Sequence, residues 1–252
     1  MIYDLIIHRQ PIDKGWSGDQ KYCAVTADGE KYLLRISPID RLKRKRREYE
    51  KMSKVAQLGI PMCLPVEFGT CDEGAYSIQS WIDGEDAEEA IMAMDADAQY
   101  QYGLDAGRIL AKLHTILAPE NAPDWETRFN AKIDRKIAMY ENCELKYESG
   151  GDPFLKYIEE NRHLLHDRPQ SYQHGDYHIG NMMLSGERLV IIDFDRFDYG
   201  DPWEEFNRIV WCAQASPLFA SGMVDGYFGA DKGNAVPEEL WALLALYISC
   251  NT

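Results

Sequence analysis

The segment 174–181, HGDYHIGN, places groups that accept protons and bind metal ions within eight positions. Asp176 lies five residues before Asn181, and Asp193 follows twelve residues later, at the end of the apolar run LVIID. Phosphoryl transfer needs such a set: one carboxylate takes the proton of the attacking hydroxyl, while an amide oxygen and a second carboxylate hold Mg²⁺ on the nucleotide phosphates. The pattern predicts Asp176 as the base and Asn181 and Asp193 as magnesium ligands.

A second interpretation of this segment is a metal-dependent hydrolase. His174, Asp176 and His178 have the His-x-Asp-x-His pattern that occurs in metal sites. This interpretation gives no role to Asn181 or to the run IIDFD that follows it, so the kinase interpretation explains more of the sequence.

A kinase also needs a turn that covers the phosphates and a cation on a nearby strand. The stretch KGWSGDQKY resembles such a turn, although it is not a full G-x-G-x-x-G. In the predicted strand YLLRIS, Arg35 stands where a cation would contact the α- and β-phosphates, and Lys31, at the strand start, is the poorer candidate. We expect three residues of the turn to lie near the β- and γ-phosphates: Gly15, Ser17 and Gly18.

Kinases pair this strand cation with a glutamate on a helix. Glu48 and Glu50 both lie in the helix predicted after the third strand, and Glu48 shares a helical face with Met52 and Val55. We therefore expect Glu48 to pair with Arg35. In the competing interpretation both glutamates offset the basic run 41–47, RLKRKRR, which we interpret as a solvated helix start rather than a nucleic-acid site.

The elements around these residues predict an α+β fold. Residues 1–82 read as strands, including 22–26 and 31–36, with one helix that ends before Gly59. Residues 83–252 read as helices, with one small hairpin around the turn 185–188. We expect residues 1–82 to form a nucleotide-binding lobe and 83–252 a catalytic and acceptor-binding lobe. Asp152 and Asp201, each followed by proline, are predicted helix N-caps, and Glu204 is placed for a capping box.

The composition limits the classes of partner. The chain has 252 residues and a formal net charge of −15, which disfavours nucleic acid and anionic lipid. Its six cysteines show no CxxC pairing, so we expect reduced thiols and a cytoplasmic location. We expect no signal peptide and no membrane span, because no apolar run reaches about 18 residues. A monomer or weak dimer that binds small molecules is the expected form.

With these residues in place, the chain resembles the aminoglycoside phosphotransferase family. HGDYHIGN and IIDFDR are specific together, and SWIDGED, GRILAKLH and GDPWEEF support them, over a span from about Gly15 to the last residue. The resemblance implies a protein-kinase-like two-lobed fold, ATP or GTP as co-substrate, Mg²⁺ as cofactor, and the roles given above to Asp176, Asn181 and Asp193. It also implies that the His174 ring organises the loop through a backbone bond. Adenine would bind to backbone groups of Gln79, Ser80, Trp81 and Ile82.

The sequence departs from the family pattern in three places. Arg35 stands where many kinases have lysine, and Asp195 stands where a small residue is common. Asp195 would bind a second metal ion or pair with Arg196. The chain ends in the apolar run LWALLALYISCNT without a C-cap signal, so we expect it to lack the last helices that wall the acceptor pocket in the family.

Aminoglycosides are polycations, so a kinase for them needs carboxylates in its acceptor pocket. The candidates are Asp195, Asp198 and Asp225. The expected acceptor is a cationic small molecule, most simply an aminoglycoside. Choline or another small hydroxyl metabolite is the alternative acceptor, and a non-catalytic nucleotide-binding module is the alternative to an enzyme.

Overall fold

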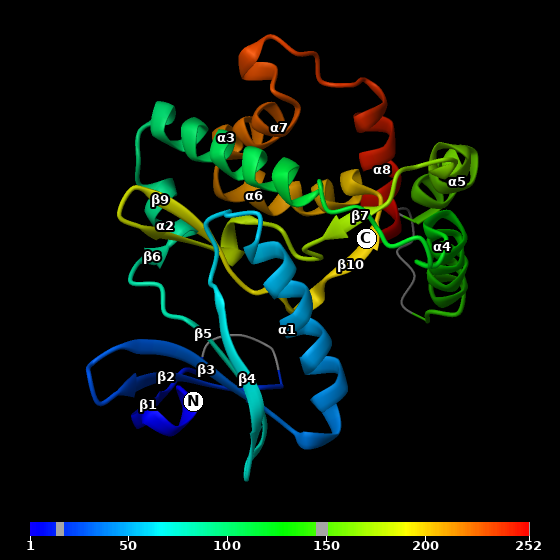
Figure 1. Ribbon diagram of the computed structural model, residues 1–252. Helices are drawn as coiled ribbons and strands as arrows, with labels where there is room; N and C mark the ends of the chain where they lie inside the picture. Colours follow the sequence, from blue (N-terminus) through cyan, green and yellow to red (C-terminus); the bar gives the residue numbers. More distant parts are fainter. Residues whose placement is uncertain (14–17, 145–150, 252) are drawn as a thin grey trace. The chain divides into compact units, whose positions relative to one another are not determined.

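The computed structural model describes residues 1–13, 18–144 and 151–251, and it forms two compact units (Figure 1). The first, called the sheet unit here, comprises Met1–Ala90 and Gly180–Asp195. The second, called the helical unit, comprises Ile91–Ile179 and Arg196–Thr252. The predicted division of roles at residue 82 stays a prediction.

A five-stranded antiparallel sheet with the order β1-β2-β3-β5-β4 builds the sheet unit. The predicted strands and the helix before Gly59 are confirmed, and Gly59 itself has a φ of +65° just after the helix end. The short 3-10 helix η1 (Tyr3–Leu5) precedes the first strand. The strands are β1 (Ile6–Pro11), β2 (Gln20–Thr26), β3 (Lys31–Ser37), β4 (Pro65–Cys71) and β5 (Gly74–Ser80), and η2 (Ile39–Arg41) leads into helix α1 (Leu42–Ala56).

The two faces of this sheet differ in polarity. Leu34 and Ile36 of β3 belong with Ile78 of β5 to a buried apolar cluster. The intervening side chains point to the other face. There Arg35 lies opposite Ser77, while Gln79 is the next β5 residue on the same side. One strand pair therefore buries an apolar face and offers a polar face for ligand chemistry.

A small hairpin completes the sheet unit, as the sequence predicts. Strand β8 (Met182–Ser185) pairs with β9 (Arg188–Ile191), and β6 (Glu85–Asp86) adds to its edge. The end of β9 is fixed to the segment after α1: the Ile191 N–H donates to the Pro61 carbonyl at 3.0 Å, and the Ile191 carbonyl accepts from the Cys63 N–H at 3.1 Å. This pairing fixes the place where Asp193 leaves the hairpin.

One apolar cluster of the helical unit joins α4 to the end of the chain. Trp125, Phe129 and Ile133, which recur every fourth residue, form an apolar stripe that is buried with Leu246 and Tyr247 near the chain end. The helices are α2 (Ala87–Met92), which bridges the units in sequence, α3 (Ala96–Leu113), α4 (Trp125–Glu141), α5 (Gly151–Asn161), α6 (Ile209–Ala215), α7 (Pro217–Phe228) and α8 (Glu239–Asn251). The shorter elements are η3 (Arg162–Leu165), β7 (Ser171–Gln173), η4 (Ile179–Asn181), η5 (Phe194–Arg196), β10 (Asp198–Gly200), η6 (Pro202–Arg208) and η7 (Ala230–Lys232).

One of the three capping predictions is confirmed. Asp201 accepts from the Trp203 N–H at the start of η6, as predicted. The capping box is wrong, because the Glu204 carboxylate is taken by Lys132 and Gln173 instead. Asp152 is not a cap, because α5 already includes Gly151 and Asp152 therefore has a helical backbone.

Helices α3 and α7 pack through glycines, and Figure 1 shows the two helices running alongside each other. A methyl group on Gly107 would overlap the carbonyl oxygen of Met223, and one on Gly226 would overlap that of Leu104. Backbone meets backbone at these points, so no side chain can rotate away. Helix α3 also supplies the Ala106 carbonyl that binds the loop containing Asp176, as described below.

We expect Gly107→Ala to destabilise the protein by about 3 kcal/mol or more, because overpacking here forces two backbones apart. The free energy of unfolding in urea measures this loss. Gln101→Ala, at an exposed position of the same helix, is the matched control and should change stability little. Equal stability of the two variants would contradict the packing described.

Within the described ranges, no helix is both long enough and apolar enough to cross a membrane.

Candidate active site

At the centre of the sheet unit's polar face, the Arg35 guanidinium is held by three aspartates. It lies 3.0 Å from Asp19, 3.2 Å from Asp193 and 2.8 Å from Asp195, measured nitrogen to carboxylate oxygen. The Arg35 side chain is only 6% exposed. Burial lowers the pKa of Arg35, but the surrounding carboxylates outweigh burial and raise it above its ordinary value.

A second cation, Lys45, lies beside Arg35, and its side chain is 11% exposed. Its Nζ is 2.8 Å from Asp19 and 2.8 Å from Glu48. Burial of Asp19 opposes ionisation, but hydrogen bonds from Lys45 and Ser37 and the charge of Arg35 prevail, so the pKa of Asp19 is lowered. Sequence reasoning missed both residues, because Lys45 sits inside a basic run that is otherwise exposed and nothing local marks Asp19.

The expected ion pair between Arg35 and Glu48 is wrong. Across residues 1–13, 18–144 and 151–251, the ion pairs of Glu48 are with Lys45 and Arg44, and those of Arg35 are with the three aspartates. Lys45 and Arg44 stand three and four positions before Glu48 on the same helix, which is the spacing at which helical side chains meet. Glu48 is therefore paired within its own helix, while Arg35 is already surrounded by carboxylates.

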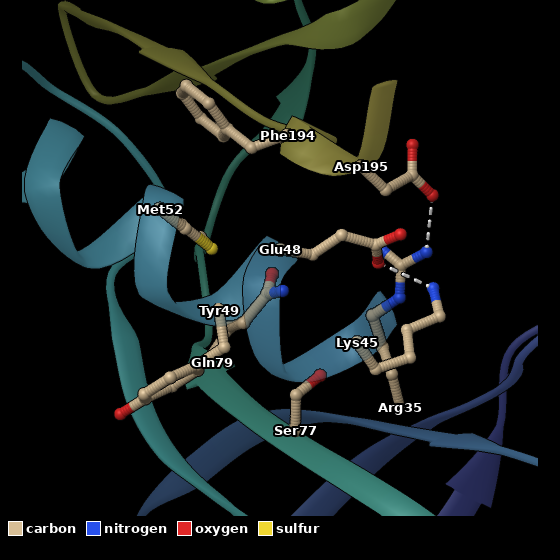
Figure 2. Close-up of a pocket in the computed structure, with 9 residues that line it drawn as sticks. All are labelled: Arg35, Lys45, Glu48, Tyr49, Met52, Ser77, Gln79, Phe194 and Asp195. Atoms are coloured by element: carbon tan, nitrogen blue, oxygen red, sulfur yellow. Dashed lines mark hydrogen bonds and ion pairs between the residues drawn. The ribbon is translucent and has the colours of Figure 1, made fainter. Parts of the chain in front are cut away.

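These groups line a pocket in the sheet unit (Figure 2). Figure 2 shows the charged side chains gathered toward one end, with dashed contacts from Arg35 to Asp195 and from Lys45 to Glu48. Apolar and aromatic side chains lie toward the other end, where Met52 and Phe194 are drawn. The full lining is Arg35, Lys45, Glu48, Tyr49, Met52, Ser77, Gln79, Phe194 and Asp195.

The hairpin brings the two predicted metal ligands to adjoining ends of its strands. Asn181 directly precedes β8, and its carbonyl accepts from the Ile192 N–H at 3.1 Å, one residue before Asp193. Asp193 itself has a φ of +66°, an uncommon conformation for a residue with a side chain. Amide and carboxylate oxygens suit Mg²⁺. The three aspartates around Arg35 and Lys45 also leave negative charge that a divalent ion would neutralise, so the donor set fits this ion.

The remaining predicted nucleotide residues are spread along the sheet unit. Gly15 and Ser17 lie outside the described residues. Gly18 lies near the Arg41 side chain, which a methyl group at Gly18 would contact. Lys31, the poorer cation candidate, pairs with Asp83 at the surface. Of the residues predicted to hold adenine, Gln79 is buried on the polar face, Ser80 ends β5, and Trp81 and Ile82 follow it.

In the helical unit, the predicted base Asp176 lies among cationic side chains. Arg196 lies 3.3 Å from one carboxylate oxygen of Asp176, and Arg208 lies 3.4 Å from the other. His178 lies 3.8 Å away. The Arg208 guanidinium stacks over the Trp211 ring, 4.5 Å from its centroid, and Trp211 is 41% exposed. An exposed aromatic surface therefore lies close to the carboxylate.

Buried contacts fix the backbone on the N-terminal side of Asp176 and just after it. The Glu205 carboxylate accepts from the His174 N–H at 2.6 Å and from the Gly175 N–H at 2.9 Å. The His174 ring accepts from the Asp176 N–H at 3.3 Å, and the Tyr177 hydroxyl donates to the Ala106 carbonyl at 2.7 Å. The loop is therefore anchored from η6 and from α3, which would hold Asp176 in one orientation.

Sequence reasoning gave Glu205 no role in holding the loop that carries Asp176. Glu205 is fully buried, and burial raises its pKa to about 8, although the two backbone hydrogen bonds oppose this shift. The nearby charges of Glu204 and Asp176 raise it further. No local pattern marks Glu205, because Glu204 and Glu205 are adjacent and only Glu205 reaches the loop that carries Asp176.

We expect the stability of the protein to fall as pH rises from about 5 to 9, in part through Glu205. The folded state keeps the Glu205 proton up to a pKa of about 8, whereas the unfolded state releases it near its ordinary value of 4.5. The stabilisation is therefore fully present below pH 4.5 and is lost progressively as pH rises to about 8, on the order of 5 kcal/mol in total. Melting temperatures across this range should fall less for Glu205→Gln than for wild type. Glu120→Gln, on an exposed loop, should follow wild type, and parallel curves for Glu205→Gln and wild type would contradict the assignment.

The predicted acceptor carboxylates already have partners in their own units. Asp198 pairs with Arg128 at 2.8 Å, and Asp225 accepts from the Tyr100 hydroxyl at 2.8 Å. One interpretation of the sequence paired Asp195 with Arg196. In the structure Asp195 pairs with Arg35 instead. A cationic acceptor would have to compete with these partners.

A model of the phosphotransferase enzyme family, APH, matches residues 8–240. The chain belongs to this family. The family assignment confirms the resemblance and makes the protein a phosphotransferase. It also leaves the hydrolase interpretation without support, and no group of three or more His, Cys, Asp or Glu side chains in the described part of the chain could hold a metal ion.

Solved structures share the fold of this phosphotransferase. A complex of APH(2")-IIia with GDP and kanamycin has a TM-score of 0.71 and 15% identity, covering 98% of this chain and 84% of that one. The amicoumacin kinase hAmiN, in complex with AMP-PNP, Ca²⁺ and Ami, has a TM-score of 0.67 and 16% identity, covering 99% and 81%. The macrolide 2'-phosphotransferase MphH from Brachybacterium faecium, as apoenzyme, has a TM-score of 0.66 and 16% identity, covering 95% and 81%. Curated protein sequences give no match. The expected kinase-like α+β fold is confirmed.

Proposed function

We propose that this phosphotransferase moves the γ-phosphate of ATP or GTP to a hydroxyl group of a small molecule. The observation that carries the proposal is the hairpin of the sheet unit, which presents Asn181 and Asp193 from adjoining strand ends beside the cation Arg35. The family assignment supports the reaction type, and the neighbours bound to GDP and AMP-PNP support a nucleotide as phosphate donor.

Asp176 is the proposed base. Its carboxylate accepts the proton of the acceptor hydroxyl while that oxygen bonds to the γ-phosphorus. The bond from phosphorus to the β,γ-bridging oxygen breaks, and the nucleoside diphosphate leaves with that electron pair. Arg196 and Arg208 hold one carboxylate oxygen each, and Glu205 and His174 fix the backbone, so Asp176 would be oriented before the acceptor arrives.

Asn181 and Asp193 would hold Mg²⁺. Bound there, the ion would supply positive charge against the phosphate oxygens during transfer. The chain supplies further cations for the phosphates, foremost Arg35, and the turn residues Gly15, Ser17 and Gly18 are the proposed cover. We propose that residues 1–82 serve nucleotide binding, with Gln79, Ser80, Trp81 and Ile82 at the adenine. Residues 83–252 would then provide catalysis and acceptor binding, in a cytoplasmic enzyme.

The acceptor class is open among the hydroxyl compounds that such kinases use. Kanamycin, amicoumacin and a macrolide are named for the three neighbours described above, which differ widely in chemistry. An aminoglycoside stays the first prediction, and choline or another small hydroxyl metabolite the second. The exposed ring of Trp211 close to Asp176 favours an acceptor with an apolar or sugar face.

A coupled assay of ADP and GDP release tests the proposal. The panel comprises aminoglycosides, macrolides, amicoumacin, choline and amino alcohols, each with Mg·ATP and with Mg·GTP, and the phosphorylated product is identified by mass. We expect diphosphate release that depends on one acceptor class. Tight binding of Mg·ATP or Mg·GTP by calorimetry without turnover on any acceptor would favour the non-catalytic module instead.

A further inference from the structure

The Asp19 carboxylate occupies a set of donors that would suit a phosphate group. One oxygen accepts from the Ser37 hydroxyl at 2.7 Å. The other lies 2.8 Å from the Lys45 ammonium and 3.0 Å from the Arg35 guanidinium. The Asp19 side chain is only 1% exposed. A guanidinium, an ammonium and a hydroxyl converging on anionic oxygens are the groups with which proteins bind phosphate.

Asp19 lies next to the segment predicted to bind the nucleotide phosphates. Asp19 directly follows Gly18, the last residue of the turn predicted to cover the nucleotide phosphates, and directly precedes β2. Its partner Arg35 is the cation predicted for the same phosphates. A carboxylate of the protein therefore fills the donor set that the proposed function requires for an anionic ligand.

Resting on the proposed function, we propose that Arg35, Lys45 and Ser37 form the phosphate-binding site of the sheet unit and that the Asp19 carboxylate fills it in the nucleotide-free protein. Lys45 is then a second phosphate-binding cation, supplied by helix α1 rather than by the sheet. The ligand class is a nucleoside triphosphate bound through its phosphate chain.

Lys45 is set apart from the rest of the basic run. Lys43, Arg44, Arg46 and Arg47 are exposed, whereas the Lys45 side chain is 11% exposed and lines the pocket. Burying one lysine of a solvated run has a desolvation cost, which Asp19 and Glu48 offset on either side. Glu48 stays with Lys45 in both states, which gives Glu48 a positioning role other than the expected pairing with Arg35.

Nucleotide binding becomes an exchange of ionic partners, in which the Asp19 carboxylate leaves Arg35 and Lys45 and moves out to solvent. The phosphate oxygens replace the Asp19 carboxylate on Lys45 and Arg35. Asp193, which contacts Arg35, receives with Asn181 the divalent cation that accompanies the nucleotide, while Asp195 keeps its contact with Arg35. Unpaired buried charges are costly, so the cluster favours binding of the metal and the phosphates together over binding of either alone.

Binding of inorganic tripolyphosphate in EDTA, measured by calorimetry, tests the proposal without metal, nucleoside or turnover. Asp19→Asn keeps the size and the Ser37 hydrogen bond but removes the competing charge. We expect this variant to bind tripolyphosphate about tenfold or more tightly than wild type. Asp72→Asn, an equal charge change at the exposed β4–β5 turn, should bind as wild type does. Equal affinities of Asp19→Asn and wild type would overturn the proposal.

A second variant tests the cations. The double variant Asp19→Asn, Lys45→Gln should bind tripolyphosphate no more tightly than wild type, because it loses the affinity that Asp19→Asn alone gains. If the double variant binds as tightly as Asp19→Asn, Lys45 is not a phosphate ligand and the proposal fails, whatever the fate of the single variant. The acceptor panel separates a failure of this proposal from a failure of the proposed function. If the wild type turns over an acceptor but Asp19→Asn gains no affinity for tripolyphosphate, only the displacement of Asp19 by phosphate is contradicted. Absence of wild-type turnover counts against the function, while the tripolyphosphate result still decides the phosphate site.

Discussion

Asp176→Asn is expected to lose about 10²–10⁴-fold in kcat, the range over which a positioned general base accelerates a reaction. The amide has the size of the carboxylate but cannot take the proton of the acceptor hydroxyl. The backbone of the loop should keep its place, because Glu205 and Tyr177 hold it through groups that the substitution leaves intact. Affinity for Mg·ATP or Mg·GTP should stay near that of wild type. Steady-state rates with the acceptor found in the panel, together with calorimetry of nucleotide binding, measure both effects.

The matched control for Asp176→Asn is Asp134→Asn in α4, where the carboxylate pairs with Arg162 at the surface of the same unit. This control should keep the wild-type kcat. A rate within threefold of wild type for Asp176→Asn would remove Asp176 as the base. A parallel loss of nucleotide affinity and melting temperature would instead point to a role of Asp176 in holding Arg196 and Arg208.

The sequence predicted the parts of the structure that short-range patterns determine. The hairpin around residues 185–188 follows from two apolar runs that flank a polar turn with glycine, and antiparallel pairing then brings the residues at its two ends together. The helix before Gly59 and the apolar stripe of α4 follow from helical spacing. Because Asn181 and Asp193 flank the predicted hairpin, the sequence also predicts that they lie close together.

The sequence could not predict which charges meet. The aspartates around Arg35 lie 16, 158 and 160 positions away in the chain, and such pairings leave no periodic signal. A general kinase rule assigned Glu48 to Arg35, and in this chain Lys45, three positions before Glu48, takes that place. Long-range geometry decided the outcome, because Arg35 was already neutralised by carboxylates from other elements.

The direction of single side chains was equally hidden. The run at 41–47 reads as a uniformly solvated face, yet Lys45 points inward and its neighbours do not. Glu204 and Glu205 look alike in sequence, yet one meets Lys132 and the other is buried under the loop that carries Asp176. A buried charge among similar exposed ones becomes visible only when its partners are in place. Such residues, including Lys45 and Glu205, are where the structure adds most to the sequence.

Asp193→Asn is expected to weaken binding of Mg·ATP or Mg·GTP by at least about 100-fold, since even substitutions outside the direct ligands of a metal can cost that much. The variant should fold, because Arg35 keeps Asp19 and Asp195 as partners after one carboxylate is lost. Calorimetry with each nucleotide in Mg²⁺, and electron paramagnetic resonance of Mn²⁺ in its presence, measure the loss. Asp83→Asn, which removes a surface partner of Lys31 in the same unit, is the control.

The same variant also separates the metal site from the proposed phosphate site. Asp193 contacts Arg35 but contributes nothing to the donor set of Ser37, Lys45 and Arg35 around Asp19. Tripolyphosphate binding in EDTA should therefore survive in Asp193→Asn, or strengthen, since Arg35 loses one competing carboxylate. If Asp193→Asn lost both Mg²⁺-dependent nucleotide binding and metal-free tripolyphosphate binding, the metal site and the phosphate site would be one site. The proposed exchange of partners would then not occur. Unchanged Mg²⁺-dependent nucleotide binding would show that Asp193 is not a metal ligand. The neighbouring positions of Asn181 and Asp193 at the ends of the hairpin would then have no role in metal binding.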